Sequence, residues 1–552
     1  MTERAISSRI RWPDGLSHLI DTDYRIGQDN IRRRFGPIGL DIHNPVFLIS
    51  GIASIVFVIF TLALPEQASA IFSAMFSFTT TTFDWFFLTS ANFVVLFALL
   101  LIVTPLGKVR LGGSKAVPDY SYTGWFAMLF AAGMGIGLMF YGVSEPMTHF
   151  STAMGGTAAE NGVRTDWAPL GAAQGNQEAA ISLGMAATIY HWGLHPWAIY
   201  ATVALALALF SFNKGLPLTI RSAFYPLLGE RVWGWWGHAI DTIAVFATLF
   251  GLATSLGFGA TQASAGLNAL FGVPLGTTTE IVLIIGITSV ALVSVLRGLD
   301  GGVKVLSELN MGLAALLALF LLITGPTIFL LGFFWDSLVS YGERLLPLSM
   351  PFGREDVNYS QGWTAFYWAW WISWSPFVGM FIARVSRGRT VREFITCVLL
   401  IPSLVCILWM SIFGGTAIHQ VVTENYTAAQ DAALELQLFR MFDLLPLAGI
   451  TSFIGIVLVI VFFVTSSDSG SLVIDTITAG GKIDAPVLQR VFWCIFEGAV
   501  AIALLVGGGL AALQSMVIST GILFTMVLLV MCFAIYKGLL SEYRSISTGS
   551  TG

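Results

Sequence analysis

Long apolar segments, separated by short polar stretches, dominate the hydrophobicity pattern of this chain of 552 residues. A helix that crosses a bilayer needs about 20 mainly apolar residues. Twelve segments meet this requirement, namely 46–65, 84–105, 121–143, 179–211, 238–269, 279–296, 303–335, 361–386, 392–415, 447–475, 487–507 and 513–537. The pattern therefore predicts an all-α polytopic membrane protein with twelve transmembrane helices.

The distribution of basic residues gives this arrangement an orientation. Charged residues make up only 11% of the chain, whereas a soluble domain carries about 25%. With the N-terminus inside, the predicted cytoplasmic segments and adjoining helix ends hold every Lys and Arg except Arg164, Arg344, Arg354 and Arg440. Because cytoplasmic loops are enriched in basic residues, we expect a multi-pass protein of the cell (inner) membrane with both termini in the cytoplasm.

The apolar segments group into two leading helices and two blocks of five. Because five is odd, the second block enters the membrane from the opposite side, as inverted repeats do. The predicted organisation is a cytoplasmic segment 1–44, two peripheral helices in 45–120, a first repeat 121–335, an external connection 336–360, a second repeat 361–537 and a short cytoplasmic tail 538–552.

Each block opens with a helix that contains a helix breaker. The breaker is Gly133-Met-Gly-Ile-Gly137 in the first block and Pro376 in the second. Non-helical backbone at membrane depth is tolerated only where protein or a water-filled cavity provides hydrogen-bond partners. Two such interruptions at corresponding positions predict a substrate or ion site at the bilayer midplane; close helix packing is the alternative explanation for the glycines.

Aromatic residues are concentrated in two of the apolar segments. Seven of the twelve residues in Phe366–Phe377 are aromatic, and a second group occupies His191–Tyr200. Indole faces bind cations that cannot donate hydrogen bonds, such as quaternary ammonium groups. An interfacial belt would place Trp near the ends of spans, but Trp371 and Trp374 lie well inside theirs. The pattern predicts an aromatic box for a cationic head group within the membrane.

Five motifs of this chain resemble the betaine/carnitine/choline transporter family. They are Ala131–Pro146, His191–Tyr200, Trp368–Met380, Phe381–Arg389 and Val464–Ser469, and the likeness extends over about 45–537. The resemblance implies a leucine-transporter-like fold of 5+5 inverted repeats, often a homotrimer, and transport rather than enzymatic activity. We find no phosphate-binding loop or catalytic constellation, and we expect no nucleic-acid partner.

The resemblance also implies a substrate site, residue by residue. Trp192, Trp197, Tyr200 and Trp371 would form the cage, and Trp374 would lie on the cytoplasmic exit path. Phe140, Phe366 and Trp370 are expected to line or gate it. His191 and His195 are expected to orient the aromatic segment through hydrogen bonds rather than to bind a metal.

A sodium site is implied between the broken third span and the tenth. Its ligands would be the carbonyl groups of Ala131, Met134 and Phe462 and the hydroxyl groups of Thr465 and Ser466. The alternative is that these hydroxyls bond back to their own helix. No cofactor and no metal other than Na⁺ are expected.

A second ion site in the family's betaine carriers uses two hydroxyls one turn apart, near an aromatic ring. Thr248 would supply one hydroxyl and Phe377 the ring. Leu252 stands where the other hydroxyl is expected, so this chain departs from the pattern.

The residue at position 137 helps to distinguish substrates. Proton-coupled choline carriers resemble this chain but place an Asp where Gly137 stands. We therefore expect a zwitterionic osmolyte, such as glycine betaine, ectoine or a sulfonium analogue, imported by sodium symport with alternating access. The segment Leu216–Ala223 resembles choline carriers, so proton-coupled or exchange transport of choline or a similar cation is the alternative.

Several charges need a role. Asp468, Glu497 and Glu308 fall inside or at the edges of predicted spans, where ionised side chains are costly. One of them could act as a proton relay, or all could have structural hydrogen-bond or ion-pair roles. The arginines between 384 and 392 and those at 32–34 are expected to anchor the inner face, with contact to anionic lipid as a further interpretation.

Overall fold

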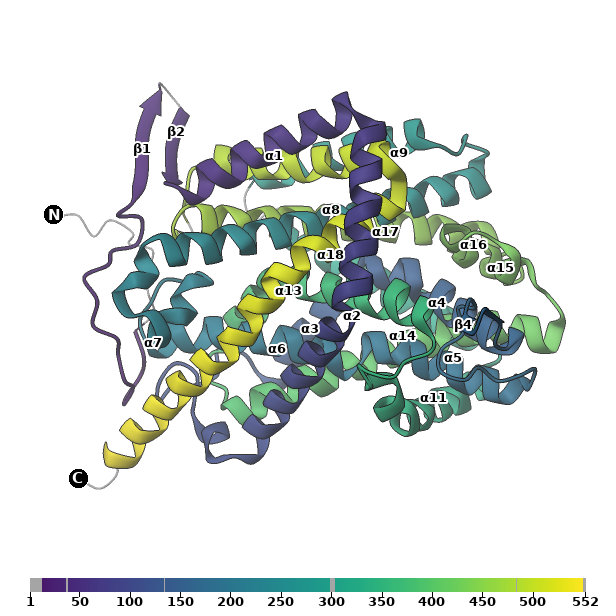
Figure 1. Ribbon diagram of the computed structural model, residues 1–552, viewed down its shortest axis with the longest axis horizontal. Coiled ribbons are helices and arrows are strands. Elements are labelled where there is room, and N and C mark those ends of the chain that lie inside the picture. Colours follow the sequence, from purple (N-terminus) through teal and green to yellow (C-terminus); the bar gives the residue numbers. More distant parts are fainter. Residues whose placement is uncertain (1–11, 36–37, 134, 298–302, 483, 550–552) are drawn as a thin grey trace.

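The computed structural model describes residues 12–35, 38–133, 135–297, 303–482 and 484–549 (Figure 1). The long helices are α1 Val46–Ala63, α2 Pro65–Val103, α3 Tyr122–Gly133, α4 Ile136–Gly155, α5 Gln177–Trp192, α6 Leu194–Ala208, α8 Trp235–Phe271, α9 Thr277–Arg297, α10 Val303–Thr324, α11 Thr327–Ser349, α13 Ala365–Val385, α14 Val391–Glu424, α17 Ala448–Thr478 and α18 Val487–Gly549. The short helices are α7 Tyr225–Leu228, α12 Val357–Tyr359, α15 Ala428–Asp431 and α16 Gln437–Phe442, and the strands are β1 Asn30–Phe35, β2 Ile38–His43, β3 Ala159–Glu160 and β4 Val163–Arg164.

Apolar side chains cover much of the outer surface. On α1, Ile52 and Ile59 are 59% and 61% exposed, and Val282 on α9 is 63% exposed. Within the described part of the chain, nine helices are long and apolar enough to cross a membrane, or ten if the bent pair α3–α4 is one span. The protein is therefore multi-pass.

The exact number of spans stays a prediction. All twelve predicted segments fall on described helices, but the last two, 487–507 and 513–537, both lie within α18. That helix is interrupted by non-helical backbone at Gly508 and Gly509, which have φ angles of 158° and 65°. Only glycine adopts such conformations readily.

The two predicted interruptions turn out differently. The first is present: α3 and α4 are bent by 66° relative to each other. The second is wrong, because α13 continues through Pro376. Proline lacks the N–H that would bond to the carbonyl group of Ile372. The Ser375 hydroxyl donates to that carbonyl instead (2.6 Å), so the helix keeps its hydrogen bonding at membrane depth.

Two further expectations need correction. The predicted segment 303–335 is divided, because Gly325-Pro326 ends α10 and a separate helix, α11, begins at Thr327. The chain is also not purely α-helical, since β1 pairs with β2 and β3 pairs with β4 in antiparallel hairpins. The β3–β4 turn is Asn161-Gly162, both with positive φ, a combination that favours tight hairpins. In the loop that follows, hydrogen bonds from Arg164 lower the pKa of Asp166 to about 2.

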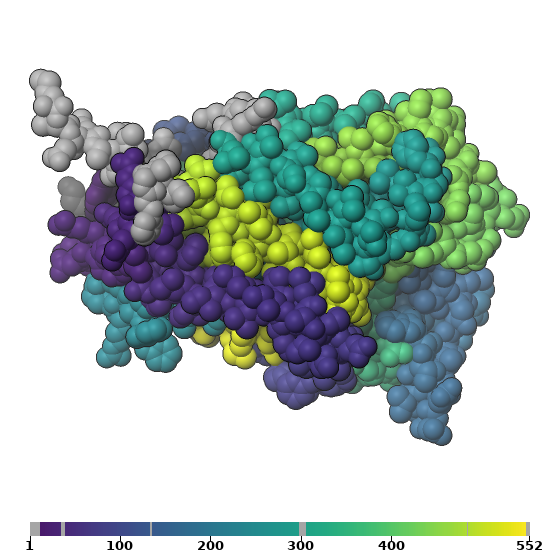
Figure 2. All heavy atoms as spheres, turned by 90° about the horizontal axis from the view of Figure 1, so that it is seen from above, coloured from purple at the N-terminus to yellow at the C-terminus, as the bar shows by residue number. Residues whose placement is uncertain are grey.

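Helix α13 lies at the centre of the molecule. It packs against α6, α8 and α18, and most of its side chains are buried. Helix α18 crosses the molecule diagonally beside α2 (Figure 1). Seen from above, this yellow helix lies between the purple N-terminal helices and teal segments of the middle of the chain (Figure 2). Apart from Phe381, which is 37% exposed, the aromatic residues of α13 are buried or partly buried.

Glu542, near the C-terminus, forms a buried ion pair and also holds the N-terminal segment. Lys214 Nζ lies 2.6 Å from Glu542 Oε1, and their side chains are 1% and 0% exposed. Glu542 also accepts hydrogen bonds from the Ser17 hydroxyl and the His18 amide, both at 2.9 Å. The predicted tail 538–552 is therefore helical as far as Gly549 and secures the N-terminal segment.

Replacing Glu542 by Gln should destabilise the protein markedly. The change leaves Lys214 buried without a counter-charge, which typically costs about 3–5 kcal/mol. Glu343→Gln is the matched control, because Glu343 is 66% exposed where it pairs with Arg344 and such pairs contribute about 1 kcal/mol or less. Chemical denaturation in detergent measures both. Equal free energies of unfolding for the two variants would contradict this account.

Candidate substrate and ion site

The four residues predicted to form the cage lie together. The Trp371 ring of α13 is 5.0 Å from that of Trp192 and 5.5 Å from that of Tyr200, at interplanar angles of 90° and 77°. Trp197 lies 5.4 Å from Tyr200, also edge to face. Gly193 separates α5 from α6, so residues on both helices reach the same point. The geometry is that of an aromatic box with perpendicular walls.

Hydrogen bonds fix the orientation of these rings. The Trp371 indole donates to the His191 carbonyl (2.9 Å), and the Trp192 indole donates to Glu145 Oε2 (2.7 Å). The Trp197 indole donates to the Trp192 carbonyl (3.2 Å). Within the described residues, the buried Tyr200 hydroxyl has no hydrogen-bond partner, which leaves it available to a ligand.

Glu145, on α4, is the centre of this network and was not singled out from the sequence. It is 0% exposed. Its Oε1 lies 2.5 Å from His191 Nδ1 and 3.3 Å from His149 Nε2, and its Oε2 also accepts from the Tyr367 hydroxyl. An acidic residue with His one turn later could have been a signal, but the predicted third span ended at residue 143.

Glu145, His149 and His191 also form a group that could contact a metal. One ligand atom from each lies within 4.8 Å of the others. The spacing of these residues along the chain did not indicate this group. A tetrahedral ion with bonds of about 2.0–2.1 Å keeps its ligands more than about 3 Å apart. The 2.5 Å distance between Glu145 and His191 is that of a direct hydrogen bond, so the arrangement is a hydrogen-bonded cluster.

The three predicted gating residues form a second aromatic layer beside the box. Phe366 and Trp370 stack at 5.5 Å, and Phe258 of α8 contacts Phe140, Phe366 and Trp370 at 5.0, 6.0 and 5.5 Å. Phe140, Phe258 and Phe366 are at most 1% exposed. Trp370 also stacks on Trp371 at 6.0 Å, so this layer adjoins the box. Phe258 was not predicted, because nothing in its local pattern distinguishes it.

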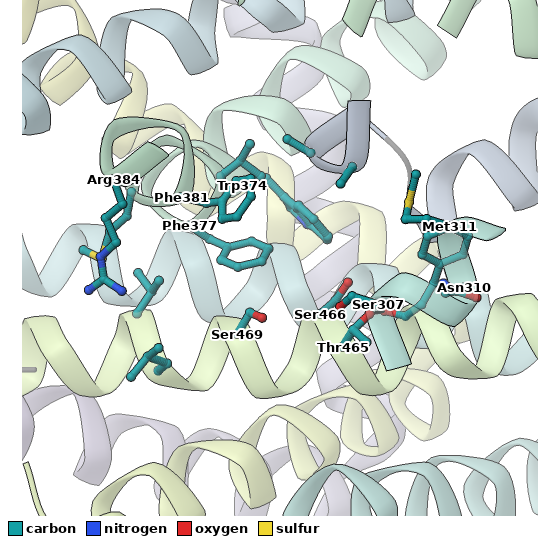
Figure 3. A pocket seen from close by; sticks show the side chains of 17 residues that line it. Ser307, Asn310, Met311, Trp374, Phe377, Phe381, Arg384, Thr465, Ser466 and Ser469 are labelled. Carbon is teal, nitrogen blue, oxygen red and sulfur yellow. Dashed lines mark hydrogen bonds between the residues drawn. The ribbon is translucent and has the colours of Figure 1, made fainter. Parts of the chain in front are cut away.

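A cavity of about 370 Å³ lies beside the box, next to Trp374. Trp374, Phe377 and Phe381 of α13 face the hydroxyl groups of Thr465, Ser466 and Ser469 on α17 (Figure 3). Arg384, near the end of α13, also lines it. Trp374 is fixed by a hydrogen bond from its indole to the Gly251 carbonyl (2.9 Å).

Four of the five predicted sodium ligands, Ala131, Phe462, Thr465 and Ser466, line this cavity. The fifth, Met134, lies outside the described residues. The Thr465 hydroxyl donates to the carbonyl groups of Val461 and Phe462, each at 3.1 Å. It therefore bonds back to its own helix, as in the alternative to sodium binding. For the second ion site, Phe377 lines the cavity, but Thr248 donates to the Ala244 carbonyl (2.7 Å) within α8.

The remaining predicted charges have different surroundings. Asp468 accepts a hydrogen bond from Ser294 (2.6 Å), Glu497 accepts one from Ser467 (2.7 Å), and Glu308 is exposed on α10. Arg387 and Arg389 are 4% and 3% exposed. They pair with Asp14 and Glu393 at 2.7 and 2.8 Å, so both have partners within the protein.

His195 has the predicted orienting environment. Its ring stacks on Trp368 at 5.2 Å, and Nε2 hydrogen-bonds Asn92 (2.9 Å). Together, the apolar outer surface, the buried aromatic box and the adjoining cavity with hydroxyl groups define a membrane transporter.

The chain belongs to the betaine/carnitine/choline transporter family: the profile described as "BCCT, betaine/carnitine/choline family transporter" matches residues 45–544. The predicted family is therefore confirmed, and the protein is a transporter rather than an enzyme.

Similar proteins cover nearly all of the chain. A glycine betaine/proline/choline transporter of Vibrio parahaemolyticus is 66% identical over 97% of both chains. A glycine betaine/proline/choline/ectoine transporter of the same organism is 52% identical over 95% of this chain and 92% of its own. A glycine betaine transporter of Bacillus subtilis is 43% identical over 87% of this chain and 91% of its own.

Among solved structures, a mutant of the manganese transporter of Eremococcus coleocola aligns with 76% of this chain and 89% of its own. The identity is 12% and the TM-score 0.35. A score this low does not establish a common fold.

Gly137→Ala should weaken substrate binding by roughly tenfold, which corresponds to about 1.4 kcal/mol. A Cβ atom at this position would lie 2.8 Å from Trp192 Cη2 and 3.1 Å from Trp370 Cη2, so one wall of the box must move. Gly135→Ala is the control, because a Cβ there meets nothing within 4 Å. Tryptophan-fluorescence titration measures both, and equal affinities would show that Gly137 does not shape the box.

Glu145→Gln should also weaken binding, by at least tenfold. The amide offers one acceptor oxygen where the carboxylate offers two, so one of its donors loses its partner, and a hydrogen bond to a charged group contributes about 1.5–3 kcal/mol. The control is Glu160→Gln in the exposed β3–β4 hairpin. The same titration applies. Unchanged affinity in a folded Glu145→Gln protein would contradict the positioning role of the carboxylate.

Proposed function

We propose that this protein is a sodium symporter that imports a zwitterionic osmolyte, such as glycine betaine or ectoine, by alternating access. The observation that carries the proposal is the aromatic box formed by Trp192, Trp197, Tyr200 and Trp371, with a hydroxyl-lined cavity beside it. The printed names of the similar proteins, which include glycine betaine, proline, choline and ectoine, support the same class of substrate.

The box suits a trimethylammonium group for a physical reason. Such a group has no N–H donor, so it gains nothing from buried acceptors, but it is attracted to the faces of aromatic rings. Each contact in a desolvated site contributes about 2 kcal/mol. The unpartnered Tyr200 hydroxyl supplies a donor for the carboxylate of a zwitterion.

Sodium binding would couple to this site through α3 and α17. Ala131 lies near the end of α3, just before the break, while Thr465 and Ser466 lie on α17 across the cavity. Carbonyl and hydroxyl oxygens suit Na⁺, and backbone carbonyls at a helix interruption are free to coordinate it. An ion held there stabilises the position of the broken helix and, with it, the wall of the box.

Alternating access is supported by the asymmetry around the box. The aromatic layer of Phe140, Phe258, Phe366 and Trp370 is closely packed, whereas a cavity next to Trp374 extends to Arg384 near the end of α13. In the predicted topology that end faces the cytoplasm, so the arrangement corresponds to an inward-facing state. Location in the inner membrane and a homotrimeric assembly remain part of the proposal.

Transport of choline is the second candidate, coupled to protons or to exchange. The most specific support is the name of the relative that is 66% identical, which includes choline. A wholly cationic substrate would be favoured by a carboxylate beside the box. Position 137, which lies there, is glycine and offers none, so this observation argues against the second candidate.

The test is a fluorescence titration of purified protein with glycine betaine, ectoine and choline, in sodium or potassium chloride. We expect Na⁺ to strengthen binding of the zwitterions, and the zwitterion to strengthen binding of Na⁺ by the same factor, because coupling between two sites is reciprocal. Ser466→Ala should reduce this factor, and Trp371→Leu should weaken binding in both salts. Equal affinity in both salts would contradict sodium coupling, and sodium-independent binding of choline alone would favour the second candidate.

A further inference from the structure

A loop of residues 156–175, which we call the outer loop, joins α4 to α5. It contains the β3–β4 hairpin and packs on α12 and on the π-helical turn Ser360–Thr364, which together lead into α13. The Trp167 ring lies directly against Gly362 of this turn, where an added Cβ atom would be 2.5 Å from Cζ3. In the predicted topology this is the outer side of the membrane. The outer loop therefore covers the outer end of the helix that carries Trp371.

The covered turn is in contact with the support of the aromatic box. The Thr364 hydroxyl hydrogen-bonds His191 Nε2 (3.0 Å), and the Tyr359 ring stacks on the same imidazole at 5.6 Å. The His191 carbonyl in turn accepts the hydrogen bond of the Trp371 indole. The turn therefore lies between the outer loop and the box, so a movement of the loop reaches the box through few side chains.

The outer loop is cross-linked within itself by polar contacts. The Arg164 guanidinium lies 2.5 Å from the Asp166 carboxylate. It also donates to the carbonyl groups of Ala168 (2.9 Å) and Leu170. The Asp166 carboxylate accepts hydrogen bonds from the amides of Ala158 (2.9 Å) and Ala168 (3.0 Å). Because these bonds join the two halves of the loop, it can move as one unit.

Two polar side chains fasten the outer loop to the segment beneath it. The buried carboxylate of Asp356 accepts a hydrogen bond from the Leu170 amide (2.6 Å). The Asn358 amide group donates to the carbonyl groups of Thr165 (2.9 Å) and Asp166 (3.2 Å). These contacts form a latch between the outer loop and the segment that leads into α13.

The latched loop carries backbone strain. Leu170, Ala172 and Gln174 have φ angles of 50°, 58° and 51°, which side chains other than that of glycine disfavour. Such residues persist only where the surrounding structure enforces them, and they cluster in clamps and switch regions. Gly156 and Gly175, at the two ends of the loop, both have a φ of 82°. Residues at the ends of elements commonly act as hinges, so the loop is a strained unit between two glycines.

We propose that the outer loop is a lid over the outer entrance to the aromatic box, held closed by Asp356 and Asn358. The proposal rests on the proposed alternating access and adds the element that closes the outer side. The lid is latched here while the cavity next to Trp374 is open, as alternating access requires of an inward-facing state. Two of the four arginines predicted outside serve the lid: Arg164 stiffens it, and Arg354 fixes Asp356 through paired hydrogen bonds of 2.8 and 2.7 Å.

The experiment locks the lid. Thr165→Cys and Asn358→Cys are combined, and the two thiols are linked in proteoliposomes by a short bifunctional methanethiosulfonate. We expect sodium-driven uptake of labelled glycine betaine to fall at least tenfold and to return on reduction with dithiothreitol. Each single-cysteine variant, treated in the same way, is the control and should show no reversible loss. In a fluorescence titration the linked protein should bind glycine betaine with unchanged affinity, because the cavity next to Trp374 stays accessible.

Undiminished uptake by the linked protein would overturn the lid. Loss of binding together with uptake would overturn it too, since the loop would then support the box instead of gating it. Failure of the proposed function looks different, because the wild-type protein would then show no sodium-driven uptake of glycine betaine.

If the double variant does not fold, Gly175→Ala decides, with Gly162→Ala in the hairpin turn as its matched control. The two glycines have φ angles of 82° and 81°, and a Cβ atom at either meets nothing within 4 Å. Alanine disfavours this backbone at both positions, but only Gly175 is at a hinge. A maximal uptake about fivefold lower for Gly175→Ala alone supports the lid, since every transport cycle passes through its closed state. Equal uptake by the two variants refutes it.

Discussion

The buried carboxylate of Glu145 is the interaction on which the aromatic box depends. It holds the Trp192 indole directly and His191 through Nδ1, and the carbonyl of His191 in turn accepts from the Trp371 indole. One side chain of α4 therefore sets two perpendicular walls carried by α5 and α13. A buried charge is tolerated when its hydrogen-bonding capacity is filled, and here the donors that fill it include a side chain of the binding site itself.

This arrangement connects the aromatic box with the proposed sodium site through few elements. Helix α13 presents Trp371 to the box and, one turn later, Trp374 to the cavity; α17 presents Thr465 and Ser466 to the other side of that cavity. Neither helix is interrupted there, whereas α3 and α4 meet at a bend of 66°. An ion bound between a continuous and a broken helix changes the population of conformations only if it binds one of them more tightly. The break provides that difference.

The local pattern was enough to predict an aromatic box, and the family resemblance to name its four residues, but neither predicted what supports it. The aromatic residues were recognisable because they lie unusually deep in apolar segments. Glu145 was missed because its importance comes from partners 46 and 222 residues away, His191 and Tyr367, which no window of sequence brings together. The predicted break at Pro376 was wrong for the opposite reason. Proline does tend to break a helix, but the hydroxyl of the adjacent Ser375 donates to the Ile372 carbonyl that proline leaves without a donor. At Gly325-Pro326 the Thr327 hydroxyl likewise donates to the vacant Leu322 carbonyl (2.6 Å), yet α10 ends there, so a compensating hydroxyl alone does not decide whether a helix continues through proline.

Three buried carboxylates of this protein show how hydrogen bonding separates structural from functional acids. Glu145 is surrounded by donors, so its charge is stabilised in place and can only position other groups. Glu542 is neutralised by Lys214 and serves as a tether. Glu497 accepts a hydrogen bond at Oε2 from Ser467, and its Oε1 has no partner among the residues that the structure describes. Since an uncompensated charge at this depth is unfavourable, this carboxyl is stable there only when a proton or another cation neutralises it. An acid whose compensation is exchangeable is suited to ion coupling, whereas the other two are suited to holding the fold.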